Sequence, residues 1–390
     1  MNSYTETTHT SWFRRIQQSI TGVLFGLVVL VAAIVGLFWN EGRAVTTAKS
    51  LEEGAGIVVS VPAGAVDPAN DGKLVHVTGL VSIEAPLHDE SIGITANGVR
   101  LKRVVEMYQW KESSRSETRK KLGGGEETVT VYTYARDWSA SQINSSNFKQ
   151  PGGRSNPPMA ISSATFSAPR GKLGAFTIIE NILGRIGSEA PYPVGPQNAE
   201  TVKVAEMLNK PAQFVDGTIF LGYRPAEPRV GDYRISYRLV GEGEISVVAK
   251  QSASTLVGYP TKAGDTIEIV RNGVHSAKEI FADAQAGNTV LTWILRVFGI
   301  FVLMFAFSMM MRPIAVTADV VPFIGYIVRK GTGLIAFVLA ILVGSVVIAA
   351  AWFFYRPLLS IIIVAIGAGI AIAVSYFSKD KTDEEVAQPS

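Results

Sequence analysis

Four long runs of apolar residues constrain this chain more than any other feature of its sequence. A bilayer core of about 30 Å needs roughly 20 apolar residues in a helix, because each residue rises about 1.5 Å and every backbone polar group must be hydrogen-bonded internally. Only Arg296, near the start of the second run, interrupts the four with a charge. The sequence therefore predicts four transmembrane helices, at residues 20–39, 291–311, 334–354 and 358–377.

The basic residues that flank these runs indicate how the chain is oriented. The first run exceeds the core of about 7 to 15 residues of a cleaved signal peptide, so a signal anchor is favoured over that alternative. Lys and Arg in short flanks resist translocation, which places Arg14, Arg15 and the tail 1–19 in the cytoplasm. By alternation, the connection 312–333 and the tail 378–390 lie there too. We therefore expect an integral multi-pass membrane protein with both termini cytoplasmic.

Residues at the ends of the spans form a first group of candidates, because aromatic and charged side chains prefer the headgroup level of a bilayer. The membrane-interface candidates are Trp39, Glu41, Arg43, Arg296, Tyr355 and Arg356. For Glu41 and Arg43, capping the first helix and fixing its depth is favoured over a functional site. The connection 312–333 is too apolar for a free loop. It is predicted either as an interfacial helix broken at Pro322 or as a loop packed under the bundle.

Small residues repeat every fourth position in three of the spans, and such stripes let helix backbones approach closely. The helix-packing candidates are Gly22, Gly26, Ala336, Ala340, Gly344, Ala365, Gly369 and Ala373. A three-residue turn joins the third and fourth spans, so these should pack as an antiparallel hairpin. The stripe on the first span can serve either its own chain or a neighbouring copy, which makes a homo-oligomer the expected assembly.

Residues 40–290 carry the pattern of a β-rich domain. Alternating, β-branched segments recur at residues 74–83, 99–110, 128–138, 213–221, 233–240, 245–250 and 266–270. The polar, Gly-containing stretch 111–127 predicts the tip of a long hairpin, and helical spacing in 176–186 and 202–208 predicts two short helices. The predicted fold class is an α+β membrane protein, with four transmembrane helices and a large β-rich extracytoplasmic domain inserted between helices 1 and 2.

Residue types that carry catalysis or ligand binding are sparse. The chain has no cysteine, which excludes disulfides, thiol nucleophiles and Cys-ligated metals, and its 4 histidines lack the spacing of a helical zinc site. Neither GxxxxGK[ST] nor GxSxG occurs. A formal net charge of only +3 gives no support for nucleic-acid binding. We therefore predict no catalytic, cofactor-binding or metal-binding residue, and no cofactor.

Several strings together resemble the transmembrane protein 43 family, also called LUMA, over nearly the whole chain. They are NEGRA at 40–44, VEMYQW at 105–110, VGD at 230–232, GDT at 264–266 and FYRPL at 354–358. The resemblance implies four spans and one extracytoplasmic domain. It also implies self-association and, for animal members in the inner nuclear and endoplasmic reticulum membranes, lamina-linked partners such as emerin. The chain departs from the family in its N-terminal tail and in 152–212, which suggests a bacterial inner-membrane member.

These observations favour a non-enzymatic, self-associating membrane scaffold that organises partners or the membrane envelope. Its expected partners are the lipid bilayer, further copies of itself and other membrane or envelope proteins. An oligomeric channel or lipid-handling protein is the first alternative, although nearly uncharged spans argue against conduction. An unrecognised hydrolase in the extracytoplasmic domain is the second, and would need a deep pocket with convergent titratable groups.

Overall fold

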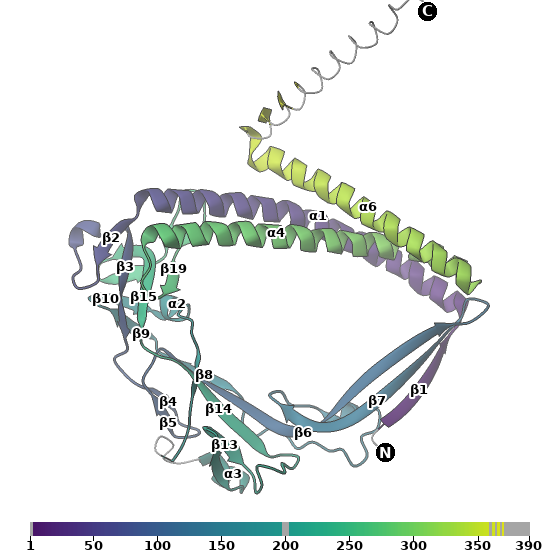
Figure 1. Ribbon diagram of the computed structural model, residues 1–390, viewed down its shortest axis with the longest axis horizontal. Coiled ribbons are helices and arrows are strands. Elements are labelled where there is room, and N and C mark those ends of the chain that lie inside the picture. The colour runs from purple at the N-terminus through teal and green to yellow at the C-terminus, as the bar shows by residue number, and fades with distance from the viewer. Residues whose placement is uncertain (1–2, 197–202, 359–360, 363–364, 367–368, 370–390) are drawn as a thin grey trace, which may run out of the picture. The chain divides into compact units, whose positions relative to one another are not determined.

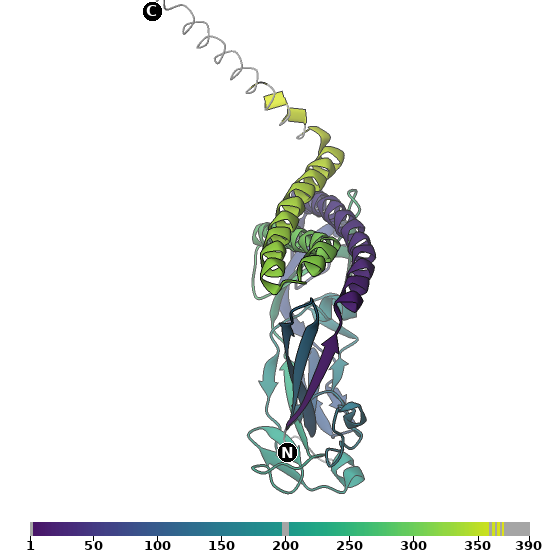
Figure 2. The ribbon, with the colours of Figure 1, turned by 90° about the vertical axis from the view of Figure 1, so that its right-hand side faces the viewer.

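The computed structural model describes residues 3–196 and 203–358, with positions 361–362, 365–366 and 369 (Figures 1 and 2). The chain divides into two compact units. The first unit contains the residues up to His9, Ser50–Arg119 and Glu127–Ala284. The second contains Thr10–Lys49, Lys120–Glu126 and the residues from Gln285 onward. Each unit therefore combines segments that are far apart in the sequence.

An eight-stranded sheet forms one part of the first unit. Its strands are β1 (Ser3–Thr10), β6 (Arg100–Lys120), β7 (Glu126–Ser139), β8 (Ala164–Ser167), β11 (Ala190–Tyr192), β12 (Ala212–Val215), β13 (Thr218–Leu221) and β14 (Tyr233–Val240). The main order is β1-β7-β6-β14-β13-β12, with β8 paired to β6 and β11 to β14. Strands β6 and β7 are the long hairpin that the polar stretch 111–127 predicts.

A second sheet in the same unit closes on itself. It contains β2 (Val59–Pro62), β3 (Leu74–Ser82), β9 (Arg170–Leu173), β10 (Phe176–Ile179), β15 (Glu244–Ser252), β16 (Thr255–Val257) and β19 (Ile269–Asn272). Strands β3, β15, β16, β10 and β9 pair in a ring, because β15 bonds both β16 and β3. The ring is a five-stranded barrel, a closure that leaves no free edge among its members. Two small ladders, β4 (Leu87–Asp89) with β5 (Ile94–Ala96) and β17 (Tyr259–Pro260) with β18 (Thr266–Ile267), complete the β structure.

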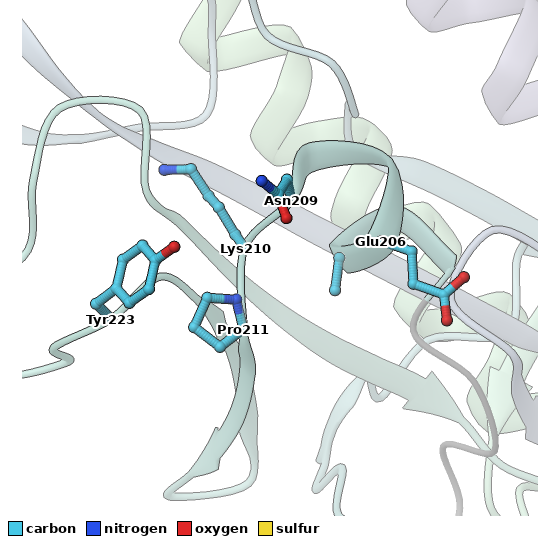
Figure 3. A pocket seen from close by; sticks show the side chains of 6 residues that line it. Glu206, Asn209, Lys210, Pro211 and Tyr223 are labelled. Carbon is cyan, nitrogen blue, oxygen red and sulfur yellow. The ribbon is translucent and has the colours of Figure 1, made fainter.

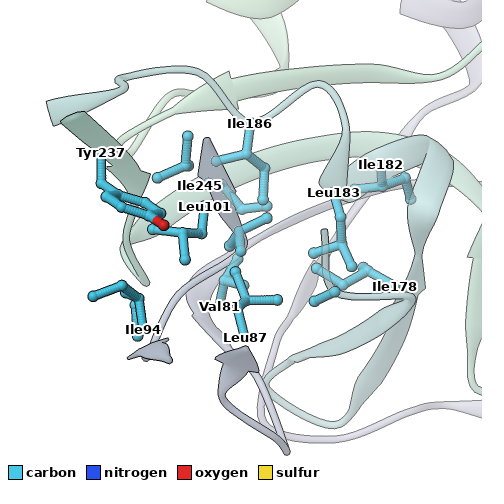
Figure 4. Close-up of a cluster of buried hydrophobic side chains, with 14 of the residues drawn as sticks. Val81, Leu87, Ile94, Leu101, Ile178, Ile182, Leu183, Ile186, Tyr237 and Ile245 are labelled. Atoms are coloured by element: carbon cyan, nitrogen blue, oxygen red, sulfur yellow. The ribbon is translucent and has the colours of Figure 1, made fainter. Parts of the chain in front are cut away.

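Alternation along the strands explains the core. Successive residues of a strand point to opposite faces, and β6 buries every second side chain from Leu101 to Gln109. Leu101 joins Val81, Ile178 and Ile245 in a continuous apolar cluster (Figure 4). All four of these side chains are 0–2% exposed, so they supply the burial that holds sheet and barrel together.

Four helices account for about half of the remaining described chain: α1 (Trp12–Ile57), α4 (Ala277–Met310), α5 (Arg312–Ala318) and α6 (Pro322–Tyr355). Of these, α1, α4 and α6 are long and apolar enough to cross a membrane, by length and composition. The predicted fourth span, 358–377, lies mostly outside the described residues, as do Ala373 and the tail 378–390. The described chain is thus an α+β protein with three long apolar helices and a β-rich region.

The structure refines several boundaries that the sequence predicts. All seven alternating segments contain strands, whereas 176–179 is strand β10 and only α2 (Glu180–Leu183) follows as helix. Because Phe176 and Ile178 alternate into the core, strand periodicity prevails there over the helical spacing. The second predicted short helix is α3 (Lys203–Leu208). The connection 312–333 is helical, with Pro322 opening α6, a position where its missing N–H costs no helix bond.

The N-terminal tail forms strand β1 instead of a free segment. The Tyr4 ring lies 6.1 Å from that of Tyr132 on β7. The Glu6 carboxylate accepts hydrogen bonds from the Tyr132 hydroxyl at 3.1 Å and from Lys149 Nζ, which it also meets in an ion pair at 2.9 Å. The bonds from Lys149 and Tyr132 hold the pKa of Glu6 below its ordinary 4.5. Beside it, burial and the bond to Glu6 raise the pKa of Tyr132, with a smaller contribution from Glu112.

We expect β1 to be held less firmly against β7 in acid. The pKa of Glu6 is 4.5 in the unfolded chain and lower in the folded protein. The ionised carboxylate therefore stabilises the docked strand fully above pH 4.5, and this contribution is lost as the pH falls through the folded pKa. A nitroxide on cysteine at Thr7, an exposed position, should therefore gain mobility below about pH 4.5, the unfolded Glu6 value. In Glu6→Gln the label should be mobile at neutral pH and lack this step. A step of equal size in Glu6→Gln would assign the pH dependence to another group.

Candidate functional site

The small-residue stripes pack the three long helices of the second unit against one another. An added Cβ at Gly26 would lie 3.0 Å from the Ala306 carbonyl oxygen of α4, and one at Gly22 would lie 3.8 Å from Met309. Ala336 and Ala340 of α6 are fully buried, and a Cβ at Gly344 would meet Ile300 at 3.1 Å. The Gly22 and Gly26 stripe thus faces α4 of its own chain.

The described part of the fourth span behaves differently. Ala365 is exposed, and an added Cβ at Gly369 would meet no described atom within 4 Å. The expected hairpin of the third and fourth spans therefore remains a prediction.

A buried carboxylate lies where these helices meet. Glu41 of α1 is 2% exposed and accepts two hydrogen bonds from the Arg296 guanidinium of α4, each of 2.7 Å. The Trp352 indole of α6 donates to the same carboxylate at 2.8 Å. Two parallel bonds between a planar guanidinium and a carboxylate fix both distance and orientation. One side chain of α1 therefore ties together all three long helices.

Arg43, two residues further along α1, adds a second layer of bonds between α1 and α4. Its guanidinium donates to the Asn288 side-chain oxygen at 2.9 Å and to the Thr292 hydroxyl at 3.0 Å. The Asn288 amide donates in turn to the Ala44 carbonyl at 3.0 Å, and the Asn40 amide to the Thr292 carbonyl at 3.3 Å. We call Asn40, Glu41, Arg43, Asn288, Thr292, Arg296 and Trp352 the Glu41 cluster.

Aromatic rings surround this cluster. The Arg296 guanidinium lies 4.7 Å from the centre of the Trp293 ring and 5.6 Å from that of Trp352. Gly42 lies against the Tyr355 ring, where an added Cβ would approach Cζ to 2.6 Å. This contact explains why a glycine stands between Glu41 and Arg43. Cation–π contact and the low polarity of the rings strengthen the ion pair by excluding water.

The remaining interface candidates lie at the margin of the Glu41 cluster. Trp39 is 61% exposed, unlike the buried Glu41. Arg356 caps α6 through its backbone N–H, which donates to the Trp352 carbonyl at 2.8 Å, and its guanidinium lies 5.9 Å from the Trp352 ring centre. The structure therefore brings Glu41, Arg43, Arg296 and Tyr355 together and leaves Trp39 outside.

A second buried carboxylate lies at the other end of the apolar part of α1. Asp319, which caps α5 and is 0% exposed, accepts hydrogen bonds from Arg15 at 2.5 Å, from Arg329 at 2.6 Å and from Lys120. Arg15 also meets Glu126 at 3.0 Å and donates to the Gly124 carbonyl. Burial by itself raises the pKa of Asp319, but the bonds from Lys120 and Arg15 outweigh it and hold that pKa below its ordinary 3.8. We call Arg15, Lys120, Glu126, Asp319 and Arg329 the Asp319 cluster.

The first unit contains a buried polar group as well. Asp89 is 0% exposed, accepts two 2.7 Å bonds from Arg103 and receives the Tyr237 hydroxyl at 2.6 Å. Burial and the bond to Asp89 raise the pKa of Tyr237. Asp89 on β4 is thus bonded to β6 and β14 of the eight-stranded sheet, and Arg103 also donates to the Ser162 carbonyl, so this group is structural.

A pocket with a volume of about 280 Å³ lies between α3 and β12 (Figure 3). It is lined by Ala205, Glu206, Asn209, Lys210, Pro211 and Tyr223. Lys210 is occupied by bonds to the Gly231 carbonyl at 2.8 Å and to Asp232 at 2.6 Å. Among the residues that the structure describes, no three His, Asp or Glu side chains gather as a metal site. This pocket therefore offers one free carboxylate and no acid and base pair.

Sequence reasoning found three of the seven residues of the Glu41 cluster and none of the Asp319 cluster as candidates. It identified Glu41, Arg43 and Arg296 because they stand beside long apolar runs. It passed over Asp319 and Asn288, whose partners lie hundreds of residues away. A single acidic residue in the apolar connection 312–333 is the signal that marks Asp319.

Three apolar helices joined through buried ion pairs define an integral membrane protein with three candidate spans. A family model described as transmembrane protein 43 matches residues 107–357, which is more than half of the chain. The mouse protein "Transmembrane protein 43" is 31% identical over 361 residues, 89% of this chain and 88% of its own length. The human protein of that name is 31% identical over 93% of this chain and 90% of its own length. The chain belongs to the transmembrane protein 43 family.

More distant sequences and solved structures complete the comparison. A Drosophila melanogaster protein named as a transmembrane protein 43 homolog is 27% identical over 88% of this chain and 92% of its own length. No solved structure matches the chain. The predicted family membership is thus confirmed by sequence.

Proposed function

We propose that the chain is a non-enzymatic, self-associating membrane scaffold that organises partners or the envelope around it. The observation that carries this proposal is the outward face of α1. Ala32 and Gly36 are exposed four residues apart, and an added Cβ at Gly36 would meet no described atom within 4 Å. A small-xxx-small pair on a lipid-facing surface permits close approach of a second helix.

The neighbouring side chains suit a helix contact in lipid. Val28, Val31 and Val35 flank the small pair and are 56–64% exposed. The inward stripe is occupied, because Gly26 already contacts Ala306 and Met309 of α4. A second copy would therefore contact the face of Ala32 and Gly36, while the Glu41 cluster keeps the three helices fixed behind it.

We expect replacement of Ala32 and Gly36 together by Ile to weaken self-association roughly tenfold, equivalent to about 1.4 kcal/mol. Bulky side chains hold two helices apart and leave the span apolar. Mass photometry in mild detergent and in nanodiscs would measure the assembled fraction across a concentration series.

The matched control is Leu27→Phe, which enlarges an exposed residue of the same helix on a different face from the small pair. It should retain wild-type association. A wild-type protein that is monomeric in both media would reject the scaffold proposal. Equal assembly of the Ala32/Gly36 variant and wild type would reject this face as the contact.

A further inference from the structure

The apolar stretches of the three long helices end beside the Glu41 cluster. The apolar run of α1 ends two residues before Glu41, that of α6 ends just before Tyr355, and Arg296 lies near the start of the α4 run. Hydrogen bonds from Arg296 and Trp352 to the Glu41 carboxylate hold these ends together. Aromatic and charged side chains at the ends of apolar spans lie at the depth of the lipid headgroups. The Glu41 cluster therefore lies beside the headgroups of neighbouring lipids.

The charges in this region do not balance. Three guanidinium groups, those of Arg43, Arg296 and Arg356, lie in or beside the Glu41 cluster. Among the residues that the structure describes, Glu41 is the only acidic group that forms an ion pair with any of them, and that pair is with Arg296. Two positive charges, on Arg43 and Arg356, therefore remain without a counter-ion. Next to hydrocarbon an unpaired charge is costly, so this region attracts an anion.

Neutral groups alone hold Arg43 in place. Its guanidinium donates to the side-chain oxygens of Asn288 and Thr292, and to that of Asn40 at 3.3 Å. Its Nε–H is buried and meets no acceptor in the described part of the chain. Amide and hydroxyl dipoles orient a guanidinium without cancelling its charge, and a buried charge needs such cancellation. The positive charge of Arg43 therefore remains to attract an anion from outside the chain.

Arg356 and its neighbour Tyr355 have hydrogen-bond donors without partners. The half-buried Arg356 side chain makes no hydrogen bond or ion pair with a described residue, and its guanidinium lies 5.9 Å from the centre of the Trp352 ring. The Tyr355 hydroxyl makes no hydrogen bond with a described residue either. The Tyr355 ring lies against Gly42, where an added Cβ would come within 2.8 Å of the hydroxyl oxygen. Because Gly42 directly precedes Arg43, these free donors lie next to its uncompensated charge.

We propose that Arg43, Tyr355 and Arg356 form a binding site for the phosphate group of an anionic phospholipid. Arg356 donates to the phosphate oxygens, because a planar guanidinium presents parallel N–H groups that match their spacing, and the Tyr355 hydroxyl donates a further bond. The nearby charge of Arg43 attracts the phosphate. The acyl chains lie against Phe353 and Phe354, which are 61% and 69% exposed on α6. Basic pockets between spanning helices are a recurrent way of holding lipid headgroups.

The charge excess selects among possible ligands. Phosphatidylglycerol brings one negative charge to a region with two uncompensated positive ones, whereas phosphatidylcholine carries its own cation beside the phosphate. Inorganic phosphate offers the same oxygens but has no acyl chains, so it gains nothing from apolar burial. The site should therefore prefer an anionic lipid over both of the others.

Native mass spectrometry of the full chain tests this preference. The protein is released from micelles that contain a graded amount of one phospholipid, and the retained lipid is counted. We expect phosphatidylglycerol to be retained about tenfold more tightly than phosphatidylcholine, and an excess of inorganic phosphate to leave its retention unchanged. Equal retention of the two lipids would overturn the proposal. Displacement of phosphatidylglycerol by inorganic phosphate would also overturn it, because the site would then take a soluble anion.

Variants locate the site on the chain. Arg356→Gln should weaken the retention of phosphatidylglycerol about tenfold, because the charge-assisted bonds to the phosphate are lost. Tyr355→Phe removes only a hydroxyl and should weaken it about fivefold, which keeps the test decisive if Arg356→Gln is unstable in lipid-free detergent.

The matched control is Lys49→Gln, which removes an exposed cation from α1, the helix that carries Arg43. It should retain the lipid as the wild type does. Equal losses in Lys49→Gln and Arg356→Gln would show a general attraction between charges and reject the site. Wild-type retention in both Arg356→Gln and Tyr355→Phe would reject it as well.

Discussion

Replacing Glu41 by alanine is expected to destabilise the helix assembly by about 3–5 kcal/mol, the range found when one partner of a buried ion pair is removed. The Arg296 side chain is only 12% exposed and would keep its charge without a counter-ion. The Trp352 indole would lose its acceptor at the same time. Unfolding by a denaturing detergent in mixed micelles, followed by tryptophan fluorescence, would measure the loss.

Two control variants separate the ion pair from simple packing. Glu41→Ala combined with Arg296→Met removes both charges, so it should recover most of the stability that Glu41→Ala loses, because no unpaired charge remains. Glu53→Ala, which removes one exposed bond to the Lys262 N–H, should change stability little. If Glu41→Ala unfolds with the wild-type midpoint, the Glu41 cluster is not what joins the helices.

Replacing Asp319 by alanine is expected to release the hairpin tip. Three cations, from Arg15, Lys120 and Arg329, converge on this carboxylate and would repel one another without it. We expect a loss of about 3 kcal/mol, the low end of the range for buried pairs, because Lys120 and Arg329 are partly exposed. Opening of the tip should then become about a hundredfold more frequent.

Limited trypsin digestion reads out this opening directly, because Lys120 and Lys121 lie in the tip. Cleavage there should accelerate about a hundredfold in Asp319→Ala when opening equilibrates before cleavage. Asp137→Ala removes an exposed ion pair to Lys111 in the same hairpin and should leave the tip rate unchanged. Unaltered tip cleavage in Asp319→Ala would show that other contacts, such as the bond from the Gly123 N–H to the Val320 carbonyl at 3.2 Å, hold the tip.

Short-range patterns in the sequence determined the helices and strands of this protein. Each apolar run had the length that a helix needs, so α1, α4 and α6 were predictable, although their polar ends extend beyond 20–39, 291–311 and 334–354. Alternation predicted the strands, and the polar stretch 111–127 predicted the β6–β7 hairpin, because side-chain direction along a strand depends only on position. The NEGRA and EMYQW strings indicated the family.

Contacts between distant residues were decided only by the tertiary structure. Glu41 accepts hydrogen bonds from Arg296, which is 255 positions away, and Asp319 accepts one from Arg15, which is 304 positions away. A periodic pattern in the sequence does not predict pairs at such separations. The polar tail Ser3–Thr10 has no apolar alternation of its own, and it becomes a strand because β7 offers an edge with unpaired backbone groups. The barrel likewise closes through the pairing of β15 with β3. The sequence by itself determined which segments are helix and strand, whereas packing and hydrogen bonding across the fold decided which of them meet.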